Sequence, residues 1–146
     1  MRLLIVSDSH GNSAALDDLL KKYPNMDLYL HAGDLEADYQ SIRPFDCVRG
    51  NCDYFSDLPE RRILNTPYGT LLMQHRPEPP LSILKEYDVK IVVFGHTHRR
   101  KFELINGVYY INPGAISFSR DGKELSYAIM EISKESVKAK FYSLLD

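Results

Sequence analysis

Residues 90–98 have the sequence KIVVFGHTH, and this stretch decides the fold class. The apolar run from 91 to 94 is typical of a buried strand, and Gly95 ends it. His96 and His98 follow at a spacing of two residues, so an extended backbone would direct both imidazoles to the same side, where adjacent metal ions could share them. The stretch therefore predicts a strand with metal ligands at its end.

Four more clusters of polar residues each follow a run that predicts a strand. The runs are RLLIV from residue 2, DLYLH from 27, DCVR from 46 and TLLMQ from 70. With the two histidines above, the clusters give seven candidate metal ligands: Asp8, His10, Asp34, Asn51, His75, His96 and His98. Loops at one edge of the sheet are where an α/β protein builds its site, so we expect these side chains to lie together.

The chemistry of the seven side chains favours metal-dependent hydrolysis. Carboxylates, imidazoles and an amide carbonyl suit a first-row divalent ion such as Mn, Fe, Zn or Ni. Seven ligands exceed the needs of one tetrahedral site, and a carboxylate can bridge two ions, so the set predicts a dinuclear centre. Two ions in turn imply chemistry on phosphorus or a related hydrolysis.

Each cluster taken alone also has an ordinary structural explanation. An Asp-x-His after a strand commonly opens a helix or a turn, and the Gly-Asp and Gly-Asn pairs at 33–34 and 50–51 are frequent turn dipeptides. A single histidine such as His75 is more often hydrogen-bonded near the surface than bound to a metal. The five clusters together, in this order and each at a strand end, favour metal binding.

The run of motifs closely resembles that of the calcineurin-like metallophosphoesterases. The resemblance covers nearly the whole chain and is strongest to their small single-domain branch, the YfcE-type phosphodiesterases. The segments that carry it are Asp8-Ser9-His10, Gly33-Asp34, Gly50-Asn51, His75, Gly95-His96-Thr97-His98 and the closing Asn112-Pro113-Gly114.

The resemblance implies an α/β fold, a two-sheet β-sandwich flanked by helices on both faces, in four layers. Residues 1–146 would form a single domain. Asp8, His10 and His98 would hold one ion, Asn51, His75 and His96 the other, and Asp34 would bridge them. The expected cofactors are two divalent metal ions, with Mn first and Ni, Zn or Fe as alternatives. The implied reaction is hydrolysis of a small phosphoester, most simply a diester, by in-line attack of a metal-bound hydroxide.

Composition agrees with an enzyme of this kind and disfavours other classes. The chain has 146 residues, of which 44% are hydrophobic, enough for one core. A formal net charge of −2 disfavours stable nucleic-acid binding. No apolar stretch is long enough for a signal peptide or membrane span, so we expect cytoplasmic residence and no membrane partner. Cys47 and Cys52 are expected to be reduced thiols. The sequence gives no indication of the oligomeric state.

Two positions depart from the family's usual pattern. Many members carry a histidine after the Gly-Asn pair as a general acid, whereas here Cys52 follows, and a thiol is a poor general acid. We therefore assign no catalytic protein residue. Arg76 stands where the family usually has glycine; it would bind the substrate phosphate, narrow the cleft, or simply face solvent. His31 and Asn112 are expected to support ligands or their loops from behind.

Two other functions stay open at this stage. A relative of this fold in the retromer complex is a protein-interaction scaffold, so the chain could bind metal with little or no turnover. Scaffold members have lost ligands, whereas all seven positions here keep residues able to bind metal, which favours the enzyme. Activity on monoesters is equally open, because the choice depends on cleft shape rather than on any motif.

The remaining pattern predicts alternating strands and helices followed by a strand-rich half. Helices are expected near 13–23, capped by Ser13, near 35–42 and near 80–87. The strands expected besides those above are residues 61–65, 101–105, 108–112, 125–132 and 135–143. Asn106-Gly107 predicts a two-residue hairpin turn.

Overall fold

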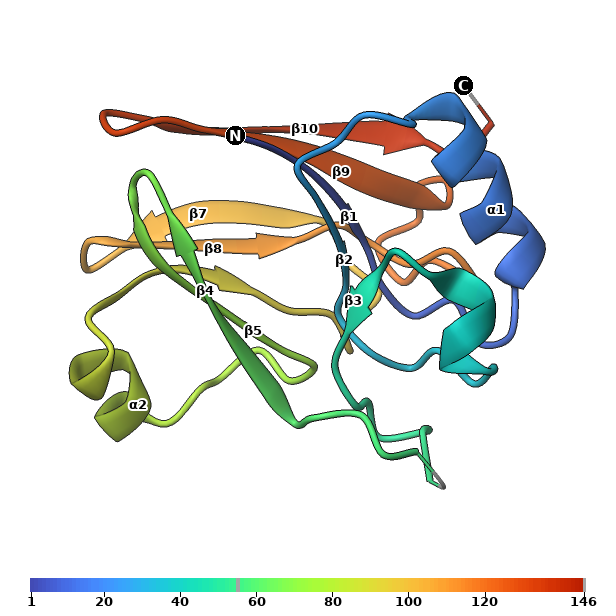
Figure 1. Ribbon diagram of the computed structural model, residues 1–146, viewed down its shortest axis with the longest axis horizontal. Helices are drawn as coiled ribbons and strands as arrows, with labels where there is room; N and C mark the ends of the chain where they lie inside the picture. The colour runs from blue at the N-terminus through green and yellow to red at the C-terminus, as the bar shows by residue number, and fades with distance from the viewer. Residues whose placement is uncertain (55, 146) are drawn as a thin grey trace.

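Two five-stranded mixed sheets form the centre of the molecule (Figure 1). The computed structural model describes residues 1–54 and 56–145. The first sheet has the order β10-β9-β1-β2-β3, with β1 Arg2–Val6, β2 Leu28–His31, β3 Asp46–Cys47, β9 Ser126–Ile132 and β10 Val137–Ser143. The second has the order β4-β5-β6-β8-β7, with β4 Arg61–Thr66, β5 Gly69–Gln74, β6 Val89–Val93, β7 Lys101–Ile105 and β8 Val108–Asn112.

Three neighbouring strands of each sheet run parallel, which brings their carboxyl ends to one edge. β1, β2 and β3 are mutually parallel, and so are β5, β6 and β8. The antiparallel strands β9 and β10 complete the first sheet, while β4 and β7 form the two edges of the second. Side chains on the loops after β1, β2, β3, β5 and β6 can therefore converge.

The main core lies between the two sheets. Along β1, Leu3 and Ile5 face the second sheet, while Leu4 and Val6 face outward and are equally buried. Because successive strand residues point to opposite faces, a strand covered on both sides has a continuous apolar sequence, as the run RLLIV does.

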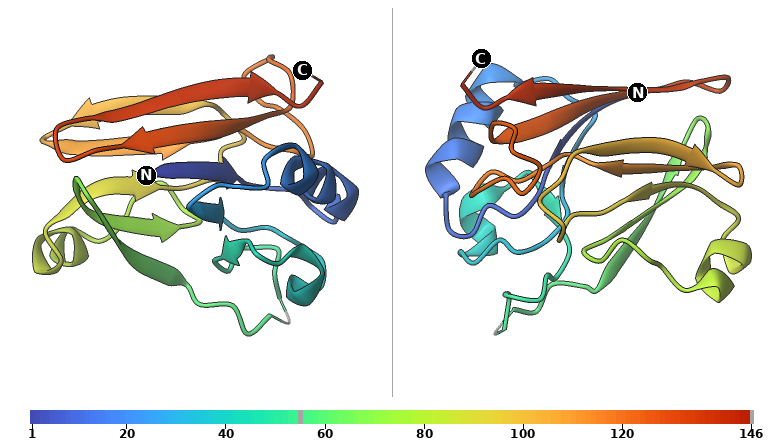
Figure 2. Two further views of the ribbon diagram at one scale, coloured as in Figure 1. Left: turned by 45° about the horizontal axis from the view of Figure 1, so that its top comes forward. Right: turned by 180° about the vertical axis from the view of Figure 1, so that it is seen from behind.

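Helices cover the two outer faces, so the layers run helix, sheet, sheet, helix. Leu16 and Leu19 of α1 (Ser13–Lys22) pack on the outer side of the first sheet. Ile83 and Leu84 of α2 (Leu81–Glu86) pack on the outer side of the second. The two helices lie on opposite sides of the molecule (Figure 2). The predicted four-layer α/β sandwich is confirmed. No helix among residues 1–54 and 56–145 is long and apolar enough to span a membrane.

The predicted helix near 35–42 is wrong for most of its length. Only Tyr39–Ile42 is helical, as one 3-10 turn. Asp34 and Glu36 both have positive φ, and their backbone N–H groups donate to the carboxylate of Asp53, at 2.9 Å each. Hydrogen bonding to a distant side chain therefore replaces the helical pattern over the residues before Tyr39.

Smaller differences concern the ends of elements. Asn12, not Ser13, caps α1, because its side chain accepts a hydrogen bond from the backbone of Ala15. The predicted strand 46–49 ends at Cys47. The Asn106-Gly107 hairpin is confirmed: both residues have positive φ, as the favoured two-residue turn requires.

Candidate metal centre

The structure brings the seven predicted residues together at the edge where the two sheets meet. We call this set the seven-residue cluster: Asp8, His10, Asp34, Asn51, His75, His96 and His98. The first four follow β1, β2 and β3 of the first sheet, and the three others follow β5 and β6 of the second. The backbone N–H of His96 donates to the carboxylate of Asp8 at 3.1 Å, which links the two sheets at this point. The cluster therefore draws on both halves of the sandwich.

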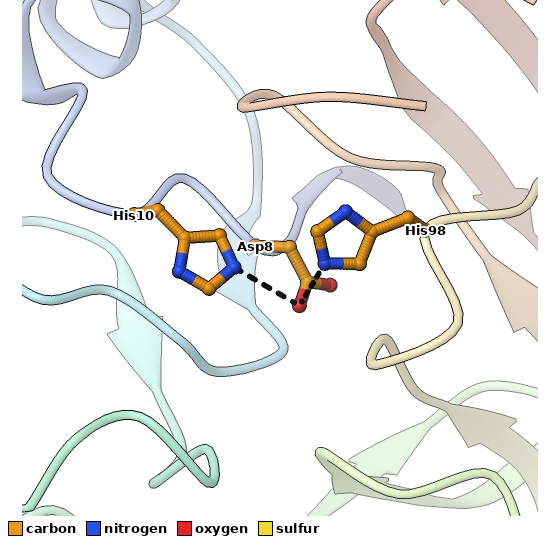
Figure 3. A group of neighbouring side chains, drawn as sticks. All are labelled: Asp8, His10 and His98. Atoms are coloured by element: carbon orange, nitrogen blue, oxygen red, sulfur yellow. Dashed lines mark ion pairs between the residues drawn. The ribbon is translucent and has the colours of Figure 1, made fainter. Parts of the chain in front are cut away.

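Asp8 lies between two histidines (Figure 3). Its Oδ1 is 3.2 Å from His98 Nε2 and 3.9 Å from His10 Nε2. Its Oδ2 accepts hydrogen bonds from the Ser7 hydroxyl and the backbone of His96, at 2.6 and 3.1 Å. One oxygen of the carboxylate is thus fastened to the protein, and the other faces the imidazoles.

Two buried atoms of this group have no hydrogen-bond partner among the described residues. They are Asp8 Oδ1 and His10 Nε2. A buried polar atom left unpaired costs about 1–3 kcal/mol, more when it is charged. A carboxylate oxygen and an imidazole nitrogen are both donors that a first-row divalent ion accepts, so the residues fit a metal site.

Three of the histidines are oriented through their Nδ1 atoms. Nδ1 of His75 lies 2.8 Å from the Ala32 carbonyl, and Nδ1 of His98 lies 2.9 Å from the Phe118 carbonyl. Nδ1 of His10 lies 2.8 Å from the carboxylate of Glu36. A neutral imidazole that donates through Nδ1 has an unprotonated Nε2, and this is the form in which such a ring binds a metal.

Asp34 and Asn51 connect the remaining side chains. Asp34 Oδ2 is 3.2 Å from His75 Nε2 and 3.7 Å from His10 Nε2. Its Oδ1 accepts the backbone N–H of Cys52 at 2.8 Å. Asn51 Oδ1 lies 2.8 Å from His75 Nε2 and 3.0 Å from His96 Nδ1. Asp34 therefore stands between His10 and His75, and Asn51 between His75 and His96.

The electrostatics of the cluster favour bound cations. Burial raises the pKa of Asp34, but hydrogen bonds from His75 and the Cys52 backbone outweigh it and lower the pKa to about 2. Burial also raises the pKa of Asp8, while His98 and His75 act against it and bring the pKa below its ordinary value. Both carboxylates are therefore ionised at neutral pH, and they present two negative charges to a cation.

The backbone of the cluster is held in an unusual conformation. Five of the seven residues have positive φ: Asp8 at 53°, His10 at 43°, Asp34 at 58°, His96 at 69° and His98 at 58°. Non-glycine residues adopt this region rarely and at a cost, and such residues concentrate at functional sites. The prediction that His96 and His98 share one direction on an extended backbone is therefore wrong. His98 faces Asp8, whereas His96 faces Asn51.

Two glycines permit the close packing of these loops. A Cβ at Gly95 would overlap the Ser7 hydroxyl and lie 2.6 Å from Asp8 Oδ2. A Cβ at Gly50 would overlap the backbone and carboxylate of Asp34. The Gly-His and Gly-Asn pairs are thus steric requirements of the cluster and not only turn signals.

His31 and Asn112 contact the loops of the cluster and not its side chains. His31 Nε2 lies 2.9 Å from the Ser9 hydroxyl, and its Nδ1 accepts the backbone N–H of Gly33 at 3.1 Å. Complete burial lowers the pKa of His31 to about 4, so the ring is neutral at pH 7. Asn112 donates to the carbonyl of Gly95 and the hydroxyl of Thr97, both at 3.0 Å.

Sequence reasoning missed two acidic residues of the site. Asp53 accepts the backbone N–H groups of Asp34, Glu36 and Gly50, at 2.8–2.9 Å, and so fastens two of the loops together. Its position two residues after Asn51 was a usable signal, because Asp commonly accepts nearby backbone N–H groups in turns. Glu36 has no such signal, since its contact with His10 depends on how the loops after β1 and β2 meet.

Arg76 and Cys52 flank the cluster. Arg76 is exposed, and its Nη1 lies 3.5 Å from His96 Nε2. Burial, together with the charges of Asp34 and Glu36, raises the pKa of the Cys52 thiol to about 11. The guanidinium thus stands at the rim of the centre, and the thiol is a weak proton donor.

Comparison with known proteins identifies relatives over nearly the whole chain. Residues 1–135 match the family described as the calcineurin-like phosphoesterase superfamily domain. The chain is 31% identical to the probable metallophosphoesterase YsnB of Bacillus subtilis, over 97% of this chain and 90% of that protein. It is 26% identical to the phosphodiesterase YfcE of Escherichia coli, over 95% of this chain and 92% of that protein.

Solved structures share the fold. A predicted phosphoesterase from Streptococcus pneumoniae superposes with a TM-score of 0.88 at 26% identity, covering 98% of this chain and 89% of that one. Vps29 of Entamoeba histolytica, solved in complex with zinc, superposes with a TM-score of 0.72 at 20% identity, covering 99% of each chain. At that identity the second likeness shows the fold alone.

Proposed function

The chain belongs to the calcineurin-like phosphoesterase superfamily, and from that premise we propose that it is a phosphodiesterase that works with two divalent metal ions. The observation that carries the proposal is the pair of buried unpaired atoms, Asp8 Oδ1 and His10 Nε2, within a cluster that has two ionised carboxylates. The family is metal-dependent, and the cluster supplies donors of the type that such metals take.

We assign the ligands to two groups with one shared residue. The first ion would be held by Asp8, His10 and His98, whose ligand atoms lie close together. The second would be held by Asn51, His75 and His96. Asp34 would bridge them, because its Oδ2 lies near a histidine from each group. Mn is the first metal to test, with Ni, Zn and Fe as alternatives.

The bound ions would supply Lewis acidity and lower the pKa of a water ligand to about 7, the chemistry of two-metal hydrolases. The protein's own groups do the rest. Asp8 and Asp34 compensate cationic charge, whereas the neutral amide of Asn51 adds none. Arg76 would donate hydrogen bonds to the substrate phosphate, since its guanidinium lies beside His96 at the exposed rim and matches phosphate oxygens in a bidentate manner.

No protein group is assigned to protonate the leaving oxygen. Cys52, the residue after Asn51, has a thiol pKa of about 11 and is therefore a weak acid catalyst. Substrates whose alcohol leaves readily without a proton, such as aryl diesters, should be hydrolysed faster than alkyl diesters. The proposed natural substrate is a small phosphodiester, because a net charge of −2 offers no field for a polyanion.

The proposal is tested by metal reconstitution. Metal-stripped protein is resupplied in turn with Mn, Ni, Zn, Fe and Mg ions and assayed on bis-p-nitrophenyl phosphate and p-nitrophenyl phosphate. Asp34→Asn is the inactive variant, and Asp88→Asn, an exposed aspartate away from the cluster, is its matched control. We expect metal-restored cleavage of the diester in the wild type and in Asp88→Asn but not in Asp34→Asn.

The alternative is a metal-binding interaction scaffold of the retromer-subunit type, with which this chain shares at least the fold, as the likeness to Vps29 shows. Tight metal uptake without turnover of either ester, with every ion, would establish this alternative against the enzyme. The retention of all seven candidate ligands supports the enzyme as the first choice.

A further inference from the structure

A hollow of about 430 Å³ lies directly beside the seven-residue cluster. Asn51 and His75 form its wall on the side of the cluster, and three arginines, Arg49, Arg61 and Arg76, line it elsewhere. We call this hollow the arginine pocket. The arginines come from three separate segments, the loop after β3, strand β4 and the loop after β5, so the fold and not the local sequence gathers them.

A buried glutamine ties two sides of the arginine pocket together. Gln74, only 4% exposed, accepts a hydrogen bond from Nε of Arg61 at 2.8 Å and donates one to the carbonyl of Arg76 at 2.7 Å. The oxygen of the Gln74 amide thus positions the guanidinium of Arg61, and its nitrogen positions the backbone of Arg76. The pocket is therefore a built arrangement, whereas a chance group of solvated side chains would have no such support.

The arginine pocket keeps a net positive charge. Arg49 and Arg76 have no ion pair among the described residues, and Arg61 pairs only with the highly exposed Glu60, at 3.7 Å. Such an exposed pair contributes little. Glu60 and Glu78 also line the pocket, which leaves one net positive charge beside the cluster. An anion entering here would meet guanidinium groups free to bind it.

A second hollow, on the other side of the turn at 50–53, has the opposite character. Its volume is about 860 Å³, and Glu36, Asp38 and Asp57 are among its lining residues. None of the seven cluster residues lines this acidic hollow, whereas Asn51 and His75 line the arginine pocket, so a substrate bound at the cluster borders the arginine pocket. Any further anionic group would be directed to the arginines.

We propose that the arginine pocket binds a second phosphate group of the substrate. This rests on the proposed function, because it takes the scissile diester to lie at the seven-residue cluster, where Arg76 is nearest. Arg49 and Arg61 then act as specificity-determining residues for a diester that carries a terminal phosphate. Arginine suits the role because its planar guanidinium offers paired donors to phosphate oxygens.

The test uses matched p-nitrophenyl alkyl phosphodiesters with two to four carbons that end in either a phosphate or a hydroxyl group. Release of p-nitrophenolate by the Mn-loaded protein gives kcat/KM for each member of a pair. We expect the terminal phosphate to raise kcat/KM about tenfold or more at the best chain length, as charge-assisted hydrogen bonds do. Arg49→Gln with Arg61→Gln should bring that ratio close to one.

The control variant combines Lys138→Gln with Lys140→Gln, two exposed residues of β10 far from the pocket that remove the same charge. It should keep the wild-type ratio. Arg49→Glu alone, which leaves the Gln74 contacts in place, should favour the hydroxyl ester and covers the case in which the double variant does not fold. A wild-type ratio near one, or a ratio unchanged in the folded Arg49→Glu variant, would overturn the proposal.

Failure of the proposed function gives a different result, namely no turnover of either ester. In that case calorimetry with the Mn-loaded protein compares propane-1,3-diol bisphosphate with 3-hydroxypropyl phosphate. Tighter binding of the bisphosphate that is lost in the arginine variants supports the pocket. Equal binding of the two compounds refutes it.

Discussion

The two halves of the seven-residue cluster differ in how their ligand atoms are engaged. In the buried half, Asp8, His10 and His98, two buried atoms have no hydrogen-bond partner among the described residues. In the open half, Asn51, His75 and His96, the Asn51 carbonyl already binds both imidazoles, and Asn51 itself is exposed. A metal entering the open half must displace both contacts of the Asn51 carbonyl, whereas the buried half offers His10 Nε2 and Asp8 Oδ1, which have no hydrogen-bond partner to lose in the part of the chain that the structure describes. We therefore expect the buried half to bind its ion more tightly.

The largest effect is expected from Asp34→Asn, which removes the residue between the halves. Because Asp34 contacts a histidine of each half, both ions should bind more weakly. Diesterase activity should fall by more than about 100-fold, the upper range for residues that only support ligands. Metal content measured after desalting, beside Asp88→Asn, checks this. Retention of two ions per chain in Asp34→Asn would contradict a shared role.

Variants that alter one half at a time test whether the buried half binds its ion more tightly than the open half. Calorimetric titration of metal-stripped wild type with Mn should show a tight and a weak step. His98→Ala should abolish the tight step, and Asn51→Ala should affect the weak step only. Loss of the tight step in Asn51→Ala with its survival in His98→Ala would reverse the order of the two halves.

The neutral ring of His31, behind the buried half, should make the stability of the metal-free protein depend on pH. Its folded pKa of about 4 lies below the ordinary 6.5, so the unfolded chain binds the extra proton first as pH falls. The stability from neutral His31 is complete above pH 6.5 and is lost progressively down to pH 4, by about 3 kcal/mol at 1.36 kcal/mol per pKa unit.

Urea unfolding of the metal-free protein between pH 4.5 and 8 measures this loss, and His31→Gln, an uncharged replacement, should remove it. His96, whose pKa is also lowered, adds a loss of the same sign in both proteins, so the difference between the two pH profiles measures His31. The other cluster groups with shifted pKa values act outside pH 4–6.5. Raised pKa values at His75 and His98 add stability below pH 6.5 that is lost only as pH rises further. The lowered pKa values of Asp8 and Asp34 matter only in stronger acid. Equal pH profiles for wild type and His31→Gln would show that the ring is not kept neutral.

The smallest effect is expected from Glu36→Gln. Glu36 orients His10 through Nδ1, and a glutamine oxygen can still accept that hydrogen bond without the charge. The tight metal step should weaken by about tenfold, at the lower end for such supporting residues. Glu135→Gln, an exposed glutamate near β10, is the control. An unaffected tight step would mean that His10 needs no orienting partner.

Much of the fold and of the cluster could be predicted because both depend on local patterns. Apolar runs ended by polar residues indicated the strands, and the parallel arrangement then brought Asp8, Asp34 and His96 to one edge. The contacts of Asp53 and Glu36 depend on how loops far apart in the chain meet. For the same reason the sequence pattern wrongly suggested a helix from 35, where the backbone bonds to Asp53 instead.

The positive φ angles of the cluster residues could not be predicted from the sequence either. Asp and His are enriched among residues with positive φ but adopt it in only a small fraction of cases, so the residue types at 96 and 98 do not by themselves signal this conformation. The conformation is set by contacts such as the hydrogen bond from His96 to Asp8, made with a residue of the other sheet. The local sequence thus predicts which residues are candidate ligands, whereas the direction in which their side chains point depends on contacts with distant residues.

The division of the cluster between two sheets has a consequence for biosynthesis. All seven residues precede residue 99, yet β1, which carries Asp8 and His10 at its end, pairs with β9 at residues 126–132. A growing chain thus holds every candidate ligand well before the first sheet is complete. Fragments that end before β9 should therefore contain the whole set of donors and still lack a rigid centre, so hydrolytic competence would arrive only with the last strands to leave the ribosome.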